Sequence, residues 1–228
     1  MESIGRITVL FWRLLQSPQI FIEREKIEVV FAKSLKVLLY LFAGGVALLF
    51  LSSMANLETL RSNNAVMFRA MPESFRSSSL IALAGWIPWN NFLFPIFFLL
   101  YLPIISILRF MTLKLLGDGT NLLLASLTVS ALGVIPVVVA TLISGILNNL
   151  FPIRLTPGTP GEPGIVQMIS FFLSLAGSIS EIRIIVILCK SVFQQNIGRA
   201  ILTYLIPIFI LCFMIFLTTI VTLFLMTG

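Results

Sequence analysis

The sequence predicts an all-α, polytopic transmembrane helix bundle of five spans, preceded by an N-terminal amphipathic helix in the membrane interface. Of its 228 residues, 58% are hydrophobic and only 11% are charged. Soluble domains carry about 25% charged residues, so this chain has too few charges to coat a water-facing surface. Its apolar residues gather in five long segments without strict two-residue alternation. Since lipid admits only helices and closed barrels, these segments are predicted to be helices.

The first 36 residues are predicted to lie on the cytoplasmic side, in or near the interface. Apolar residues recur there at helical spacing, with two arginines on the opposite face. Ser17 and Pro18 end this helix and start a second, whose charge run over residues 23–28 is either a solvated face or a docking surface. The candidate lipid or partner interface consists of Ile4, Arg6, Ile7, Phe11 and Arg13.

The transmembrane domain is predicted to occupy residues 37–228. Each of its apolar segments is long enough to cross the roughly 30 Å hydrocarbon core. A Pro- and Gly-rich stretch between the third and fourth segments is expected to form a stiff, extended connector. The predicted spans are 37–57, 87–108, 122–147, 164–189 and 200–227.

The distribution of basic residues predicts the orientation. Six of the 15 Lys and Arg residues precede the first span, while the loop after it holds Arg61, Arg69 and Arg76. With the N-terminus in the cytoplasm, that side carries 11 of the 15 basic residues. Because Lys and Arg accumulate on the cytoplasmic side, we expect a cytoplasmic N-terminus and an extracytosolic C-terminus.

Small and hydroxylated residues form one stripe on the third span and another on the fourth. Such residues let helix backbones approach closely, so packing is the favoured interpretation, and a polar solute pathway is the alternative. The candidate packing residues are Ser126, Ser130 and Gly133 on the third span and Ser170, Ser174 and Gly177 on the fourth.

Two charged residues lie near the predicted cytoplasmic ends of their spans. Arg109 ends the second span, and Glu181 lies at a similar depth in the fourth. An unpaired charge inside a membrane is costly, so the two form a candidate intramembrane pair. Alternatively, each side chain snorkels to the interface by itself.

The sequence lacks the residues that several classes of catalytic and metal-binding site require. It has no histidine and a single aspartate, Asp118, which removes His-based triads and HExxH zinc sites. Cys189 and Cys212 lie in apolar surroundings without metal-ligand spacing. We therefore expect no enzymatic activity, no catalytic residues, no cofactor, no metal site and no nucleic-acid partner.

Short motifs along the chain resemble the Ypt/Rab-interacting protein (Yip) family. Residues 11–18, Phe-Trp-Arg-Leu-Leu-Gln-Ser-Pro, resemble the opening of its prokaryotic members. Residues 115–120 resemble the family's turn between the second and third spans. Residues 132–136 resemble its Gly-Tyr-x-x-x-Pro element, and residues 196–200 the turn before its last span. Five spans and a cytoplasmic N-terminus also match, and the resemblance implies a bacterial or archaeal cytoplasmic membrane.

This resemblance and the absence of catalytic groups together predict a function without catalysis. We expect an integral membrane scaffold, adaptor or accessory subunit, in contact with the lipid bilayer and with a membrane-protein partner or further copies of itself. A permease or transporter subunit that moves a small solute or lipid is the alternative, because prolines such as Pro136 and Pro207 imply kinked helices.

Overall fold

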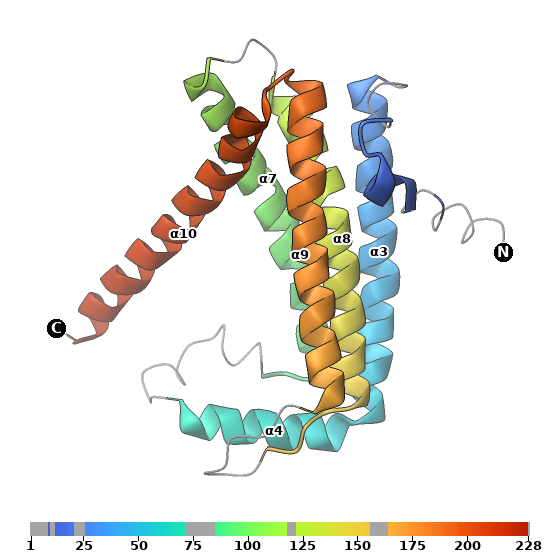
Figure 1. Cartoon of the computed structure of the whole chain (residues 1–228). Coiled ribbons are helices and arrows are strands. Elements are labelled where there is room, and N and C mark those ends of the chain that lie inside the picture. Colours follow the sequence, from blue (N-terminus) through green and yellow to red (C-terminus); the bar gives the residue numbers. More distant parts are fainter. Residues whose placement is uncertain are drawn as a thin grey trace. The chain divides into compact units, whose positions relative to one another are not determined.

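The structure is a computed structural model, and it describes residues 9, 12–20, 26–71, 85–117, 122–155 and 164–227. Helices account for 88% of these residues, and none of them forms a strand. The elements are, in chain order, the helices α3 (Ile27–Ala55) and α4 (Leu57–Ala70), the short 3₁₀ helix η1 (Trp89–Phe92), and the helices α7 (Leu93–Leu115), α8 (Leu122–Leu150), α9 (Ile165–Val192) and α10 (Ile197–Thr227) (Figure 1). The predicted all-α class is confirmed.

Five of these helices are long and apolar enough to cross a membrane, namely α3, α7, α8, α9 and α10. The structure therefore supports a multi-pass membrane protein. The helices differ from the predicted spans at two places. Helix α3 begins ten residues before the predicted span. Lys33 and Lys36 mark the start of the apolar run, but lysine is a good helix former, so the helix extends beyond them toward the N-terminus. The second span is displaced toward the C-terminus, since the chain forms η1 before α7 begins.

The chain divides into two compact units. Unit 1 comprises residues 1–38, 100–137 and 178–228, and unit 2 comprises residues 39–99 and 138–177. Each unit contains part of α3, α7, α8 and α9. Unit 1 also includes α10, whereas unit 2 includes α4 and η1.

Within unit 1, α8 packs closely against α9. A Cβ atom built on Gly133 of α8 would overlap the Ile185 side chain of α9, so only glycine allows this approach. Leu113 and Leu188 are fully buried in the same unit. The second half of α10, by contrast, has large exposed apolar side chains such as Phe213 and Phe216. An apolar surface of this kind is suited to lipid.

Within unit 2, the end of α3 packs against α8. A Cβ atom on Gly45 would lie 2.5 Å from Leu142 Cδ1, and one on Gly145 would lie 2.7 Å from Leu49 Cδ2. Both contacts place small residues where two helices approach most closely.

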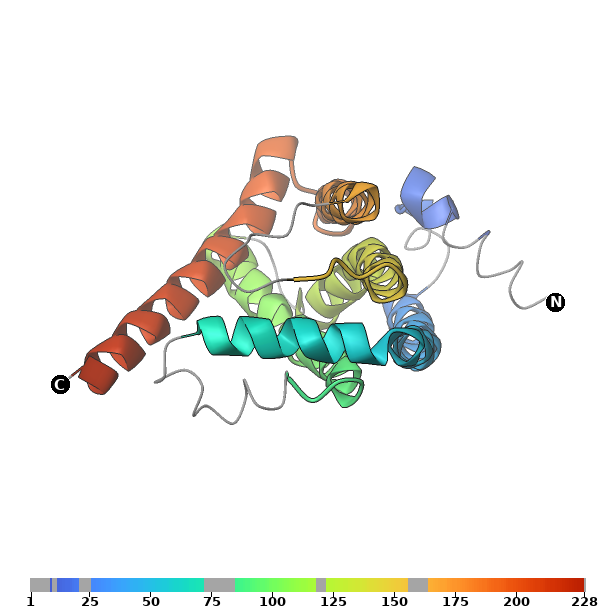
Figure 2. The same ribbon diagram turned by 90° about the horizontal axis from the view of Figure 1, so that it is seen from below.

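Helix α4 occupies the first part of the segment that was predicted to be a loop between the first two spans. It lies crosswise to the neighbouring helices of unit 2 (Figures 1 and 2). Asn56 leaves the helical conformation between α3 and α4, with φ −130° and ψ 34°. Its side-chain amide donates hydrogen bonds to the carbonyls of Asn149 and Leu150, the last residues of α8. The turn therefore also satisfies carbonyls that a helix end leaves unpaired.

Candidate functional site

A buried cationic side chain lies among four helices of unit 1. Arg109, on α7, is 2% exposed and is the largest of the fully buried side chains that the structure describes. One terminal nitrogen of its guanidinium donates a hydrogen bond to Ser130 Oγ on α8. Its Nε is also buried, and no acceptor lies within hydrogen-bond distance of it in the described residues. One terminal nitrogen of the Arg109 guanidinium is thus hydrogen-bonded, while its Nε has no acceptor among the described residues.

Ser130 belongs to a ladder of hydroxyl groups that joins α7 to α8. Ser130 Oγ donates to the Ser126 carbonyl at 2.8 Å, and Ser126 Oγ donates across to the Ser106 carbonyl of α7, also at 2.8 Å. Ser106 Oγ donates to the Leu102 carbonyl at 2.6 Å. Buried hydroxyls are costly unless bonded, so the ladder holds the two helices in one rotational setting.

Glu181 of α9 interacts electrostatically with Arg109. The hydroxyl groups of Tyr101 on α7 and Tyr204 on α10 lie in the field of the same two charges. We call Arg109, Ser130, Glu181, Tyr101 and Tyr204 the Arg109 cluster. The structure therefore brings both members of the predicted charged pair into one unit, but the direct hydrogen bond of Arg109 goes to Ser130. Pairing of Arg109 with Glu181 stays a prediction.

The chemistry available to the Arg109 cluster follows from its groups. A guanidinium keeps its charge under all ordinary conditions, so it can hold an anion or a carboxylate but cannot act as an acid. The Glu181 carboxylate accepts hydrogen bonds, and the two phenols can accept or donate them. The cluster contains no activated nucleophile beside a base, and the described residues hold no group of three His, Cys, Asp or Glu side chains that could bind a metal. Its arrangement suits charge pairing and helix positioning.

The predicted packing residues of the fourth span lie against α8 in unit 2. Ser144 Oγ donates to the Ser170 carbonyl at 3.0 Å and lies 3.3 Å from Ser174 Oγ. Ser170 Oγ donates to Asn148 Oδ1 at 3.3 Å, and Gly177 is buried. These contacts place the small-residue stripe of α9 toward protein.

A network of asparagine side chains, which was not predicted from the sequence, lies at the ends of α3 and α8 in unit 2. The Asn149 amide donates to Ser53 Oγ at 2.9 Å and to Ser52 Oγ at 3.2 Å. Asn91, just before α7, donates to the same Ser53 Oγ at 3.0 Å. The available signal was the recurrence of Asn-Asn pairs beside apolar segments, at residues 63–64, 90–91 and 148–149.

The predicted N-terminal interface lies largely outside the described residues. Ile4, Arg6, Ile7 and Phe11 are outside them, so the structure does not test the amphipathic helix. Arg13 is described, lies in a helical stretch over residues 12–16, and is exposed.

Comparison with known proteins gives no relative to set beside these features. No family model, no curated protein and no solved structure matches the chain. Its function must be argued from its own geometry.

Proposed function

We propose that this protein is a non-catalytic integral membrane scaffold, adaptor or accessory subunit of a membrane complex. The observation that carries the proposal is the bonding of α8. In its most apolar window 72% of the residues are buried, against 39% or less in each of the other four spans. Its hydroxyl groups donate to backbone carbonyls of neighbouring helices in each unit, at Ser106 of α7 and Ser170 of α9. Groups used in this way support packing and are not available to a passing solute.

The remaining spans supply surface for partners. Only 17% to 39% of their apolar windows are buried, so most of their large side chains face outward. The partners that suit this surface are the lipid bilayer and the apolar helices of another membrane protein or a second copy. The resemblance to the Yip family supports the same proposal, as does the absence of catalytic groups from the sequence.

The proposal includes a place in the cell. A bacterial or archaeal cytoplasmic membrane, a cytoplasmic N-terminus and an extracytosolic C-terminus fit the resemblance and the distribution of basic residues. The N-terminal segment with Ile4, Arg6, Ile7, Phe11 and Arg13 would then lie on the inner leaflet, where it can contact anionic lipid or a partner.

Purification of the full chain in a mild detergent, followed by mass spectrometry, tests the scaffold. We expect a stoichiometric membrane-protein partner or a homo-oligomer. Deletion of residues before Ser17 should leave the spans folded and remove the partner. The matched control is Arg154→Gln, which removes one charge from an exposed position outside the N-terminal segment and should keep the partner. A stable monomer that retains no protein partner would contradict the proposal.

The Arg109 cluster supports a second candidate, a permease or transporter subunit for a small solute or lipid. Ionisable residues inside membrane spans often mark substrate or proton pathways, and Arg109 Nε lacks an acceptor among the described residues. Solute flux into liposomes tests this candidate. Transport that disappears in Glu181→Gln but persists in Arg183→Gln, whose side chain is exposed, would favour it over the scaffold. Absence of flux across a broad solute panel would count against it.

A further inference from the structure

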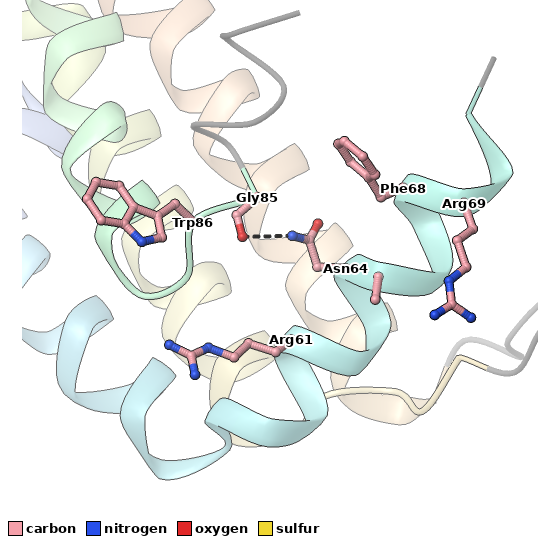
Figure 3. Close-up of a pocket in the computed structure, with 7 residues that line it drawn as sticks. Arg61, Asn64, Phe68, Arg69, Gly85 and Trp86 are labelled. Atoms are coloured by element: carbon pink, nitrogen blue, oxygen red, sulfur yellow. Dashed lines mark hydrogen bonds between the residues drawn. The ribbon is translucent and has the colours of Figure 1, made fainter. Parts of the chain in front are cut away.

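An open pocket lies beside α4 in unit 2. Its volume is about 400 Å³. One wall comes from α4 and the other from the segment that leads into η1 (Figure 3). The residues that line the pocket include Arg61, Asn64, Phe68, Arg69, Gly85 and Trp86.

The two arginines occupy one face of α4. Arg61 and Arg69 are eight residues apart, which places them on the same side of the helix about 12 Å apart along its axis, at roughly 1.5 Å per residue. Figure 3 shows Arg61 reaching from α4 toward Trp86, with Arg69 at the other end of the pocket. Among the described residues, the hydrogen bond of Arg61 is a long one, 3.4 Å from its Nη2 to the Ile87 carbonyl. A stronger acceptor can therefore replace that carbonyl at little cost.

Asparagine side chains hold α4 in place against the rest of unit 2. Asn64 Nδ2 donates to the Gly85 carbonyl at 2.8 Å and so ties α4 to the facing wall of the pocket (Figure 3). On another side of the helix, Asn63 donates to the Ile153 carbonyl and accepts from the Leu155 amide at 2.8 Å. The arginines are therefore presented on a helix that is fixed from two directions, which favours a preorganised site.

An aromatic group beside the pocket indicates its depth in the bilayer. The Trp86 and Trp89 ring centroids lie 6.1 Å apart, and Phe50 packs on Trp89 at 5.5 Å. Trp86 is 62% exposed and Trp89 is 50% exposed. Exposed tryptophans at the end of a membrane span lie at the level of the lipid headgroups, where phosphate groups are abundant.

We propose that this pocket binds the phosphate of an anionic membrane-lipid headgroup. The planar guanidinium of Arg61 matches two phosphate oxygens in a bidentate hydrogen-bond arrangement. Arg69 supplies a second positive charge. The Trp86 and Phe68 rings line the pocket and suit the glycerol and the first methylene groups of the acyl chains. The site is independent of the Arg109 cluster and of any scaffold or transport activity.

Binding of short-chain lipids to the purified full chain in a neutral detergent tests the proposal. The probes are dihexanoyl phosphatidylglycerol, dihexanoyl phosphatidylcholine and inorganic phosphate, each titrated with affinity and unfolding temperature as readouts. We expect phosphatidylglycerol to bind about tenfold more tightly than phosphatidylcholine, because the choline cation neutralises the phosphate and repels the two arginines. Inorganic phosphate should bind more weakly than phosphatidylglycerol, since it makes no contact with the aromatic rings. Equal binding of inorganic phosphate would identify a phosphate site but overturn its assignment to a lipid.

The decisive variant is Arg61→Gln. It should weaken phosphatidylglycerol binding by about tenfold, because glutamine has neither the charge nor the fork geometry of arginine. The matched control is Arg154→Gln, which removes an equal charge from an exposed position of the same unit outside the pocket lining, and it should bind as the wild type does. Retention of wild-type binding by Arg61→Gln would overturn the proposal. Should that variant fail to fold, Arg69→Gln and the wild-type preference for phosphatidylglycerol over phosphatidylcholine still decide it: equal affinity for the two lipids rejects the site.

Discussion

At the scale of single residues, Arg109 brings a full charge into the interior of a membrane-spanning helix. A charge that is buried away from water is costly unless it is paired and hydrogen-bonded, so its neighbours must offset that cost. Ser130 provides the direct hydrogen bond, and Glu181 provides an opposite charge. The hydroxyl and the carboxylate act differently, because one partner is neutral and the other is charged. Two predictions separate their contributions.

Replacement of Ser130 by Ala should lower the free energy of unfolding by about 1–3 kcal/mol, because a buried donor of Arg109 loses its acceptor. Unfolding in mixed detergent micelles measures the change. Ser34→Ala is the control: Ser34 is equally buried in unit 1, but its hydroxyl donates only to the Phe31 carbonyl of its own helix. Equal losses for the two variants would contradict the special role of Ser130.

Replacement of Arg109 by Leu should destabilise the protein by about 3–5 kcal/mol, because it leaves the Glu181 carboxylate uncompensated. Adding Glu181→Gln should recover much of the loss, since the remaining side chain is then neutral. The same micellar unfolding assay gives the coupling between the two sites. Independent, additive effects would show that the two residues do not form a charged pair.

At the scale of elements, helix contacts depend on which small residue faces a neighbour. Gly44 and Gly45 are adjacent in α3, yet only Gly45 lies against Leu142 of α8. A Cβ atom on Gly44 would meet no atom within 4 Å. The orientation of α4 also depends on its contacts. Its sequence places two arginines on one face of the helix, and the hydrogen bonds of Asn63 and Asn64 fix the direction in which that face points.

The two glycines provide a matched pair of substitutions. Gly45→Ala should destabilise by about 1–3 kcal/mol, because the added methyl group overpacks the contact with Leu142. Gly44→Ala should be neutral or slightly stabilising, since alanine is favoured over glycine in helices by about 1 kcal/mol. Thermal unfolding of both variants in detergent gives the comparison. A larger loss of stability for Gly44→Ala than for Gly45→Ala would show that Gly44, and not Gly45, faces α8.

At the scale of the whole molecule, five helices are long and apolar enough to cross a membrane. If all five cross, the two ends of the chain lie on opposite sides. Crossing a membrane satisfies the apolar surface of these helices, while basic residues set the direction. Eleven of the 15 Lys and Arg residues fall on one side when all five helices cross.

A reporter fused before Met1 should therefore read cytosolic, and one fused after Gly228 should read extracytosolic. Paired alkaline phosphatase and fluorescent-protein fusions measure the two positions. A cytosolic C-terminus would mean that one of the five helices fails to cross, with α9 the first to examine because Glu181 and Arg183 interrupt its apolar run.

The sequence by itself determined the all-α class and five apolar segments. The hydropathy of a segment is the sum over its own residues, and a segment in lipid can form only a helix or part of a closed barrel. Helix α3 begins ten residues before the predicted first span, since charged residues such as Lys33 can belong to the helix ahead of its apolar run. Residues 58–70 were predicted to be loop, because a short amphipathic helix lacks the long apolar run that marks a span.

Only the tertiary structure decided the partners. The sequence named Arg109 and Glu181 from their similar depth, but Ser130 became the acceptor through the rotation of α8 about its axis. Likewise, nothing in a Gly-Gly pair tells which member meets Leu142. Hydropathy belongs to each residue separately, whereas a hydrogen bond or a van der Waals contact depends on how two helices are turned toward each other, and that is set by all their contacts together.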